Sequence, residues 1–289
     1  MNVQTLLADF ARAWLAPLDA LPLGALTQPT AVAAPEEGPL AALYAQRDAL
    51  PHLLTDEVAR AAAINAFTAR ARRYLRLRNQ YLLFAPAQLH ALHLLHAQTL
   101  NALANALFNA PTVAAAAAET QRLLGEYRAA LAAFVGSLVE TNGSAAFVYS
   151  EPVCSRYTPE LQLRKLGVTV EELAAPVLDL GCGESAALVH HLRARGLDAQ
   201  GVDLEVEPNE FLHRADWFSF ELGEKRWGAI VSHQGFTLHF QHHHLRRNGH
   251  PERYAQRFLE ILRALAPGGR FLYAPRVPFF EEVLAKHQE

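Results

Sequence analysis

The stretch VLDLGCGESAALVHHL occupies residues 177–192 and indicates the fold class of the second half of the chain. Its first four residues suit a buried strand, the turn Gly181-Cys182-Gly183 follows at once, and a helical pattern starts near Ser185. Such a turn brings the backbone close to a bound nucleotide, because glycine has no Cβ and adopts positive φ without strain. The residues around the turn must therefore show which nucleotide it suits.

Two common nucleotide loops fit this turn poorly. A phosphate-binding loop requires a Lys followed by Ser or Thr, and no Lys follows here. A dinucleotide loop has a third glycine, where this chain has Ala186, a substitute that some such loops allow. Asp179 and Glu184 flank the turn and would repel a pyrophosphate. The pattern favours a ligand that carries positive charge and no phosphate.

The second half of the chain alternates between strand and helix patterns. We expect strands at 176–180, 199–202, 229–232 and 270–273, and helices at 159–166, 185–195 and 250–265. Residues 211–214 read as a short turn or helix, and 146–149 as a short extended piece. This alternation predicts an α/β fold with a mostly parallel sheet covered on both faces. Ligands of such sheets bind beyond the carboxyl ends of the strands.

The first half is rich in Ala, Leu, Gln, His and Arg and has almost no strand pattern. Helices are expected near 3–16, 38–50, 55–84, 86–109 and 115–140, with Thr55 at the start of the third. The chain therefore divides into an all-helical N-terminal cap, residues 1–145, and an α/β core, residues 146–289. A cap of this size could close over a pocket in the core and exclude water.

Composition limits the partners and the compartment. The net charge of −3 gives no overall attraction for nucleic acid or for an anionic membrane. No uninterrupted apolar run of about 18 residues is present, so we expect no membrane span. The two cysteines are too few for a disulfide framework, and the N-terminus does not read as a signal peptide, which favours the cytoplasm. Apolar cap helices leave a homodimer possible.

The residues V-L-D-L-G-C-G-E-S resemble the first motif of the class I S-adenosylmethionine (SAM) dependent methyltransferase superfamily. Four further segments resemble later landmarks of that family in the expected order, namely 201–203, 215–217, 227–232 and 265–271. The resemblance covers roughly residues 145–280 and implies a Rossmann-like core that binds SAM. Two departures stand out: Ser185 replaces the third motif glycine, and little chain remains for the antiparallel hairpin that the family adds after its fifth strand.

The resemblance also implies the roles of single residues. The turn approaches the methionine portion and the ribose, Asp179 helps to hold the amino end, and Asp203 accepts hydrogen bonds from the ribose hydroxyls. Asp216 takes the exocyclic amine of adenine, and Trp217 packs on the ring. The expected SAM-binding set is Asp179, Gly181, Cys182, Gly183, Asp203, Leu204, Asp216, Trp217 and Ser232.

Methyl transfer from SAM to a small molecule, in secondary metabolism, is the function that the resemblance favours. His233 could act as the general base, since an imidazole titrates near neutral pH. Tyr149 and Tyr157 could face the sulfonium through cation–π contacts. If SAM instead cyclised, Asn142 and Ser232 could accept hydrogen bonds from its own uncharged amine. These five residues form the candidate catalytic set.

Two other functions remain open. The segments VYSEPVCSRYTPELQLRKLGV (148–168) and HHHLRRNGHPERYAQRFLEILRALAPGGRFLYAP (242–275) look similar to a capped bacterial branch that includes azetidine-2-carboxylate synthases. In that reaction the amino nitrogen of SAM closes a four-membered ring on its own γ-carbon and releases methylthioadenosine. The third possibility is a SAM-binding protein without catalysis, acting as a sensor or scaffold.

Three further patterns suggest sites but have simpler interpretations. Histidines at 239, 242–244 and 250 include three consecutive residues that cannot all face one ion, and no Cys joins them, so we expect no metal. The arginines from Arg70 to Arg78 lie on several helix faces and favour salt bridges over RNA binding. His90, His93 and His96 are expected to be polar core or interface residues.

Overall fold

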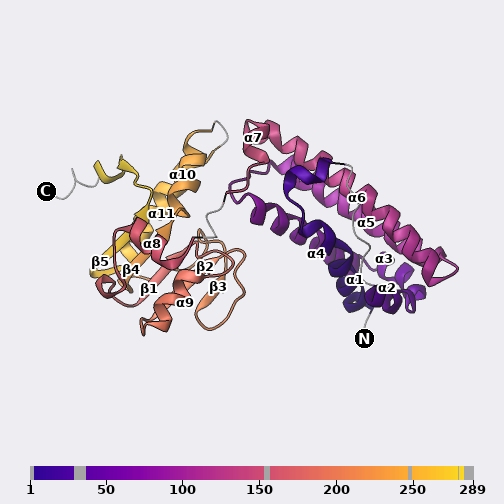
Figure 1. Cartoon of the computed structure of the whole chain (residues 1–289), viewed down its shortest axis with the longest axis horizontal. Coiled ribbons are helices and arrows are strands. Elements are labelled where there is room, and N and C mark those ends of the chain that lie inside the picture. Colours follow the sequence, from indigo (N-terminus) through magenta and orange to yellow (C-terminus); the bar gives the residue numbers. More distant parts are fainter. Residues whose placement is uncertain (1–2, 29–36, 153–156, 247–248, 279, 283–289) are drawn as a thin grey trace. The chain divides into compact units, whose positions relative to one another are not determined.

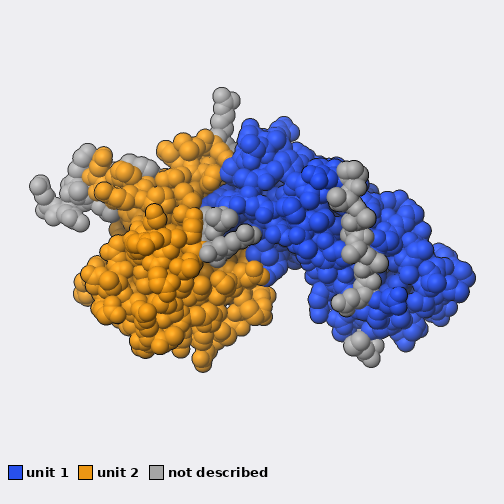
Figure 2. Space-filling model, viewed as in Figure 1, with its two compact units in different colours: residues 1–152 blue, residues 153–289 orange. Residues whose placement is uncertain are grey.

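The computed structural model describes residues 3–28, 37–152, 157–246, 249–278 and 280–282. The chain divides into two compact units, residues 1–152 and residues 153–289 (Figure 2). The division falls seven residues after the boundary expected from the sequence.

Every element that the structure describes in the first unit is a helix (Figure 1). The elements are α1 (Val3–Asp19), η1 (Leu23–Thr27), α2 (Glu37–Tyr44), η2 (Arg47–Ala49), α3 (Leu50–Thr55), α4 (Glu57–Arg78), α5 (Pro86–Asn109), α6 (Val113–Asn142) and α7 (Ala145–Val148). The long helices α5 and α6 pack against each other, and α4 packs against α5. The helical prediction for this half is confirmed.

Three local predictions in this unit are wrong. The helix expected at 55–84 is shorter and runs from Glu57 to Arg78, and the Asp56 carboxylate caps it in place of Thr55 by accepting hydrogen bonds from the amides of Val58 and Ala59. The helix expected at 38–50 ends at Tyr44 and continues as the short η2. Residues 146–149, expected to be extended, form most of α7, which Ser144 caps through the amide of Phe147.

A polar network lies inside the apolar core of this unit. The His96 side chain is completely buried, and its two ring nitrogens lie 3.0 Å from the Thr68 and Tyr127 hydroxyls. Thr68 donates its proton to the Ile64 carbonyl, so we assign the proton of the ring to Nδ1 and the acceptor role to Nε2. Burial lowers the pKa of His96 to about 4. His96 is therefore a neutral core residue, as expected.

The second unit is built on a five-stranded parallel sheet. Its strands are β1 (Val177–Leu180), β2 (Ala199–Asp203), β3 (Leu212–Arg214), β4 (Trp227–His233) and β5 (Leu265–Ala274), in the spatial order β3-β2-β1-β4-β5. Every neighbouring pair is parallel. The α/β prediction with a parallel sheet is confirmed, and no antiparallel strand is present in the part of this sheet that the structure describes.

Helices cover both faces of this sheet, because alternate strand residues belong to different apolar clusters. Val177, Ala199 and Val231 pack with α8 (Pro159–Leu166) and α9 (Ala187–Ala194). Leu178, Val202 and Ile230 pack with α10 (Phe236–His244) and α11 (Pro251–Ala264). The short η4 (Val170–Glu172) adds Val170 to the first cluster.

Two predictions in the second unit are wrong and one element was missed. Residues 211–214, expected to be a turn or helix, include β3, which pairs with the whole carboxyl half of β2. The strand expected at 270–273 already begins at Leu265, and a register irregularity opposite Trp227 and Ala229 lets β5 include the preceding residues. The helix α10 was not predicted, because its histidine-rich sequence hides the apolar spacing of Phe236 and Phe240.

Gly201 of β2 must be a glycine because the loop after β1 lies directly against it. A Cβ at this position would lie 2.8 Å from the Cys182 sulfur and 2.9 Å from Cγ2 of Val189. These distances are shorter than real carbon contacts, so a side chain here would displace the Gly181-Cys182-Gly183 turn or α9.

We therefore expect Gly201→Ala to destabilise the protein by about 1–3 kcal/mol through overpacking. Gly136→Ala is the matched control, since a Cβ there meets no atom within 4 Å. Because Gly136 lies inside α6, the control should stabilise by about 0.5–1 kcal/mol. Thermal unfolding followed by circular dichroism measures both. Equal effects of the two substitutions would contradict the close approach at Gly201.

Candidate functional site

The strand order places a topological switch point between β1 and β4. The chain leaves β1 toward β2 on one side and leaves β4 toward β5 on the other. The connections diverge there. Open α/β sheets bind ligands at such a point, beyond the carboxyl ends of the two strands, which here are β1 and β4. The residues at this edge are therefore the candidate site.

Ser232 joins the loops that follow β1 and β4. Its hydroxyl donates to the Leu180 carbonyl at 2.8 Å and accepts from the Phe236 amide at 2.9 Å. The side chain is completely buried. The prediction that Ser232 contacts the ligand needs correction, because its hydroxyl is already used between the two loops. We assign it a positioning role.

Glycines allow the two loops to approach each other. A Cβ on Gly235 would lie 2.9 Å from the Ser232 hydroxyl and 3.1 Å from the Leu180 carbonyl. Gly181 has φ +83, and Gly183 has φ +73, which favours glycine at both positions. The turn can therefore place backbone groups against a ligand.

Asp203 fixes the turn after β1 from the end of β2. Its Oδ2 accepts a hydrogen bond from the Gly183 amide at 3.0 Å, and its Oδ1 accepts one from the Glu205 amide at 2.9 Å. Each oxygen of a carboxylate can accept more than one hydrogen bond. Asp203 is thus oriented by two amides, and its contact with ribose hydroxyls stays a prediction.

Asp179 is the most unusual group of the site. Its side chain is buried in β1, and none of the residues that the structure describes donates a hydrogen bond to its carboxylate. Burial, and to a smaller extent the negative charge of Asp203, together raise the pKa of Asp179 to about 7. A buried acid without a donor calls for a ligand that brings a donor or a positive charge.

Cys182 contributes its backbone rather than its thiol. Burial and the charges of Asp179 and Asp203 raise the pKa of the Cys182 thiol. The side chain packs with the apolar cluster under α9. The Cys182 side chain therefore fills the space next to Gly201, and its thiol is not activated as a nucleophile. Cys154 lies outside the described residues.

Tyr157 and His233 form a pair at the end of β4. Their ring centroids are 5.3 Å apart with an interplanar angle of 80°. His233 is buried, and burial together with the positive charge of Lys165 lowers the pKa of its imidazole. His233 is therefore neutral at pH 7 and can accept a proton, as a general base must.

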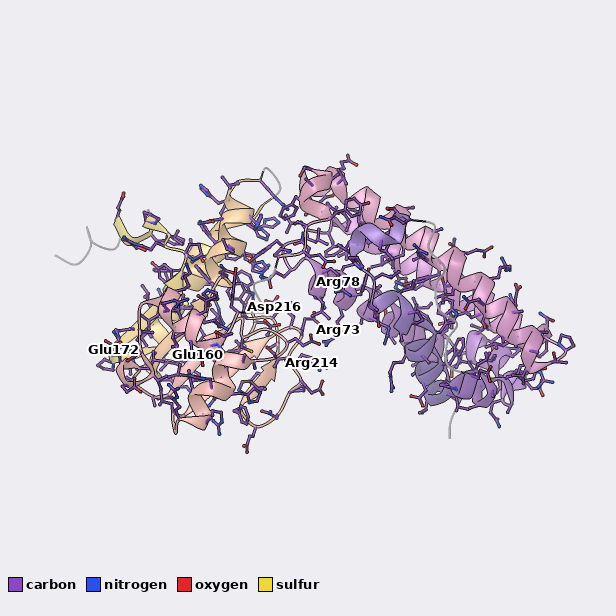
Figure 3. The ribbon with its side chains drawn as sticks, in the orientation of Figure 1. Arg73, Arg78, Glu160, Glu172, Arg214 and Asp216 are labelled. Atoms are coloured by element: carbon purple, nitrogen blue, oxygen red, sulfur yellow. The ribbon has the colours of Figure 1, made fainter. Side chains whose placement is uncertain are left out.

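The turn after β3 carries the residues expected to hold adenine. The Asp216 carboxylate (labelled in Figure 3) accepts from the Phe218 amide at 2.9 Å. The Trp217 ring lies edge-on to Phe236 and Tyr254. Leu204, next to Asp203, is 42% exposed and free to cover a ligand. The turn thus offers aromatic and apolar surface beside a fixed carboxylate.

Asn142 and Tyr149 make their described contacts inside the helical unit. The Asn142 side chain is buried and bonds the amide and carbonyl of Leu83 and the carbonyl of Leu138. We correct its assignment, because the amide is used to hold the segment before α5. Tyr149 packs on the core of the same unit. A contact of Tyr149 with substrate stays a prediction.

Thr237 of α10 was missed by the sequence analysis, and His239 was considered only as part of the histidine pattern. Thr237 is completely buried in the first turn of α10, and the His239 ring lies 5.8 Å from the Trp217 ring. Burial lowers the pKa of His239 to about 3, so this histidine is neutral. The signal in the sequence that could have predicted α10 was Gly235 near the end of a buried strand, since a glycine allows a helix to begin at a strand end.

The patterns with simpler interpretations behave as structural features. Arg70 pairs with the Asp19 carboxylate and also donates to the Arg12 carbonyl. Among the described residues, no three His, Cys, Asp or Glu side chains are arranged to hold a metal ion. His243 accepts a hydrogen bond from the His250 amide through Nδ1 and packs against Tyr254.

Two cavities lined by described residues lie away from the strand ends. One of about 570 Å³ is lined by residues of α8, η4 and the end of α9, with Glu160 and Glu172 (labelled in Figure 3) among them. Another of about 350 Å³ lies among α1, α3 and α4.

Comparisons with known proteins found no match among family models, curated proteins or solved structures. Across the described part of the chain, no helix has the length and apolar character needed to cross a membrane.

Replacing Asp179 by Asn tests the buried carboxylate. The folded-state pKa of about 7 lies above the ordinary value of 3.8, so folding takes up a proton between these values. Wild-type stability should therefore fall as pH rises from about 4 to 7, while Asp179→Asn escapes this loss. The stability gap should reach about 4 kcal/mol at most above pH 7, at 1.36 kcal/mol per pKa unit.

Denaturant unfolding at a series of pH values measures this gap without ligand. Asp198→Asn is the matched control, because the Asp198 side chain is 61% exposed and pairs only loosely with Arg193. The control should show a small difference from wild type that stays flat with pH. If the stability difference between Asp179→Asn and the wild type also stayed constant with pH, the pKa of Asp179 would not be raised in the folded state.

Proposed function

We propose that the α/β unit binds SAM at the carboxyl ends of β1, β2 and β4 and that the protein uses it for methyl transfer to a small molecule. The buried Asp179 carboxylate without a protein donor carries this proposal. It disfavours a phosphate and favours an ammonium group, which the methionine portion of SAM provides. The glycine turn and the oriented Asp203 carboxylate support a nucleoside beside it.

The positions of the other groups suggest how SAM would be held. Asp203 is oriented by two backbone amides and would accept from the ribose hydroxyls. Asp216 and Trp217 would bind the adenine edge and face, since the indole is fixed by neighbouring rings. Ser232 would keep the two loops at a constant separation.

Bound SAM would supply an electrophilic methyl carbon on its sulfonium. His233 would accept the proton of the acceptor through its neutral imidazole while the acceptor atom forms its bond to carbon. The pair of electrons of the broken carbon–sulfur bond stays on sulfur. Tyr157 would hold the imidazole in place through its edge contact, and an aromatic ring here also suits a nearby cation.

One observation favours a second reaction at the same site. A carboxylate with a pKa of about 7 can take the proton of an ammonium group, and Asp179 is such a carboxylate. The neutral amine could then attack the γ-carbon of the same SAM molecule. The carbon–sulfur bond would break with its electrons on sulfur, which gives azetidine-2-carboxylate and methylthioadenosine.

Incubation of the pure protein with SAM alone tests both reactions. Calorimetry should first show SAM binding, weakened about 10-fold or more in Asp203→Ala, because a carboxylate acceptor is lost. Mass spectrometry then follows the products. Stable SAM supports methyl transfer, and enzyme-dependent methylthioadenosine with an equimolar cyclic four-carbon amino acid supports ring closure.

The same experiment can refute the proposal. Asp198→Ala serves as the control, since this exposed carboxylate lies at the start of β2, away from the strand ends that form the site. Affinity for SAM that is unchanged in Asp203→Ala, or absent in the wild type, would overturn the SAM assignment. If the protein binds SAM but does not convert it, either by itself or with any acceptor, the function of a SAM sensor is favoured.

A further inference from the structure

The helix α10 begins at the switch point of the sheet. Gly235 lies next to Gly181 and the Leu180 carbonyl, and Phe236 starts the helix directly after it. Ser232 ties the first amide of α10 to the end of β1. The first turn of this nine-residue helix therefore lies beside the glycine turn and the carboxyl end of β1.

The first turn of α10 has amide groups available for a ligand. The Phe236 amide donates to Ser232, and the His239 amide donates to the Gly235 carbonyl at 3.2 Å. None of the described residues accepts a hydrogen bond from the amides of Thr237 or Leu238. Such amides, together with the helix dipole, attract an anion.

The Thr237 side chain gives a second and independent indication. It is completely buried, and its hydroxyl has no hydrogen-bond partner among the residues that the structure describes. Side chains on a helix lean toward its N-terminus, so this hydroxyl is directed to the same end as the two amides. A buried hydroxyl without a partner is unfavourable unless a ligand supplies the acceptor.

We propose that the first turn of α10 binds the α-carboxylate of SAM through the Thr237 hydroxyl and the amides of Thr237 and Leu238. This inference rests on the proposed SAM function and names the groups that recognise its amino-acid end. Asp179 would hold the ammonium and α10 the carboxylate, so the two sides of the switch point match the two charges of an amino acid. A ligand without the carboxylate would lose only its contact with α10.

Thr237→Val tests the assignment with two ligands. The substitution keeps the shape of the side chain and removes the hydroxyl. Calorimetry should show that the affinity for SAM falls about 10-fold or more, because a hydrogen bond to a charged group is lost. The affinity for decarboxylated SAM, which keeps the sulfonium and the amine, should stay within about 2-fold, as expected for a group that the hydroxyl never contacts.

Two controls separate this role from a structural one. Thr237→Ser keeps a hydroxyl and should retain most of the wild-type preference for SAM over decarboxylated SAM. Without ligand, Thr237→Val should melt no lower than the wild type, because the substitution removes an unsatisfied buried hydroxyl. Lost SAM affinity in a variant that is at least as stable as wild type would support the carboxylate contact.

Several outcomes would overturn the inference. Unchanged SAM affinity in Thr237→Val would show that the hydroxyl does not contact SAM. Equal weakening of SAM and decarboxylated SAM would assign the hydroxyl to another part of the ligand, and an effect seen only with an acceptor present would assign it to the acceptor. Wild-type protein that binds neither compound would refute the proposed function itself.

Discussion

The buried carboxylate of Asp179 is the constraint on which the proposed site depends. It lies in the central strand of a parallel sheet, near a second carboxylate, and none of the described residues donates to it. An apolar residue at this position would make the fold more stable, so the buried acid lowers the stability of the protein. Buried groups of this kind concentrate at functional sites, because the ligand supplies what the protein lacks.

The surrounding structure holds two loops in register around this carboxylate. Ser232 links them through one hydroxyl, and Gly181, Gly201 and Gly235 keep their approach free of side chains. The apolar clusters on both faces of the sheet keep the strand ends rigid. Such rigidity matters for group transfer, since reacting atoms must be held within a few tenths of an ångström of a productive geometry.

The sequence was sufficient for the strand–turn–helix at 177–192, and for the long helices of the first unit, because an Ala- and Leu-rich composition favours helix over strand. It failed where tertiary contacts decide. β3 has only three residues and exists because it pairs with β2, and α10 begins where Gly235 meets Gly181. Ser232 was predicted as a ligand contact, yet its partners come from residues 52 positions earlier and 4 positions later, which no local pattern reveals.

The proton balance of SAM binding tests the role of Asp179 most directly. Calorimetry in buffers of different ionisation enthalpy, between pH 5.5 and 7.5, counts the protons exchanged, and the ammonium of SAM is mostly charged over this range. At pH 6 Asp179 is mostly protonated, since its pKa is about 7, and must ionise to pair with the ammonium. We expect release of about one proton per SAM at pH 6, declining as the pH rises through 7. SAM binding without proton release across this range would contradict the role of Asp179.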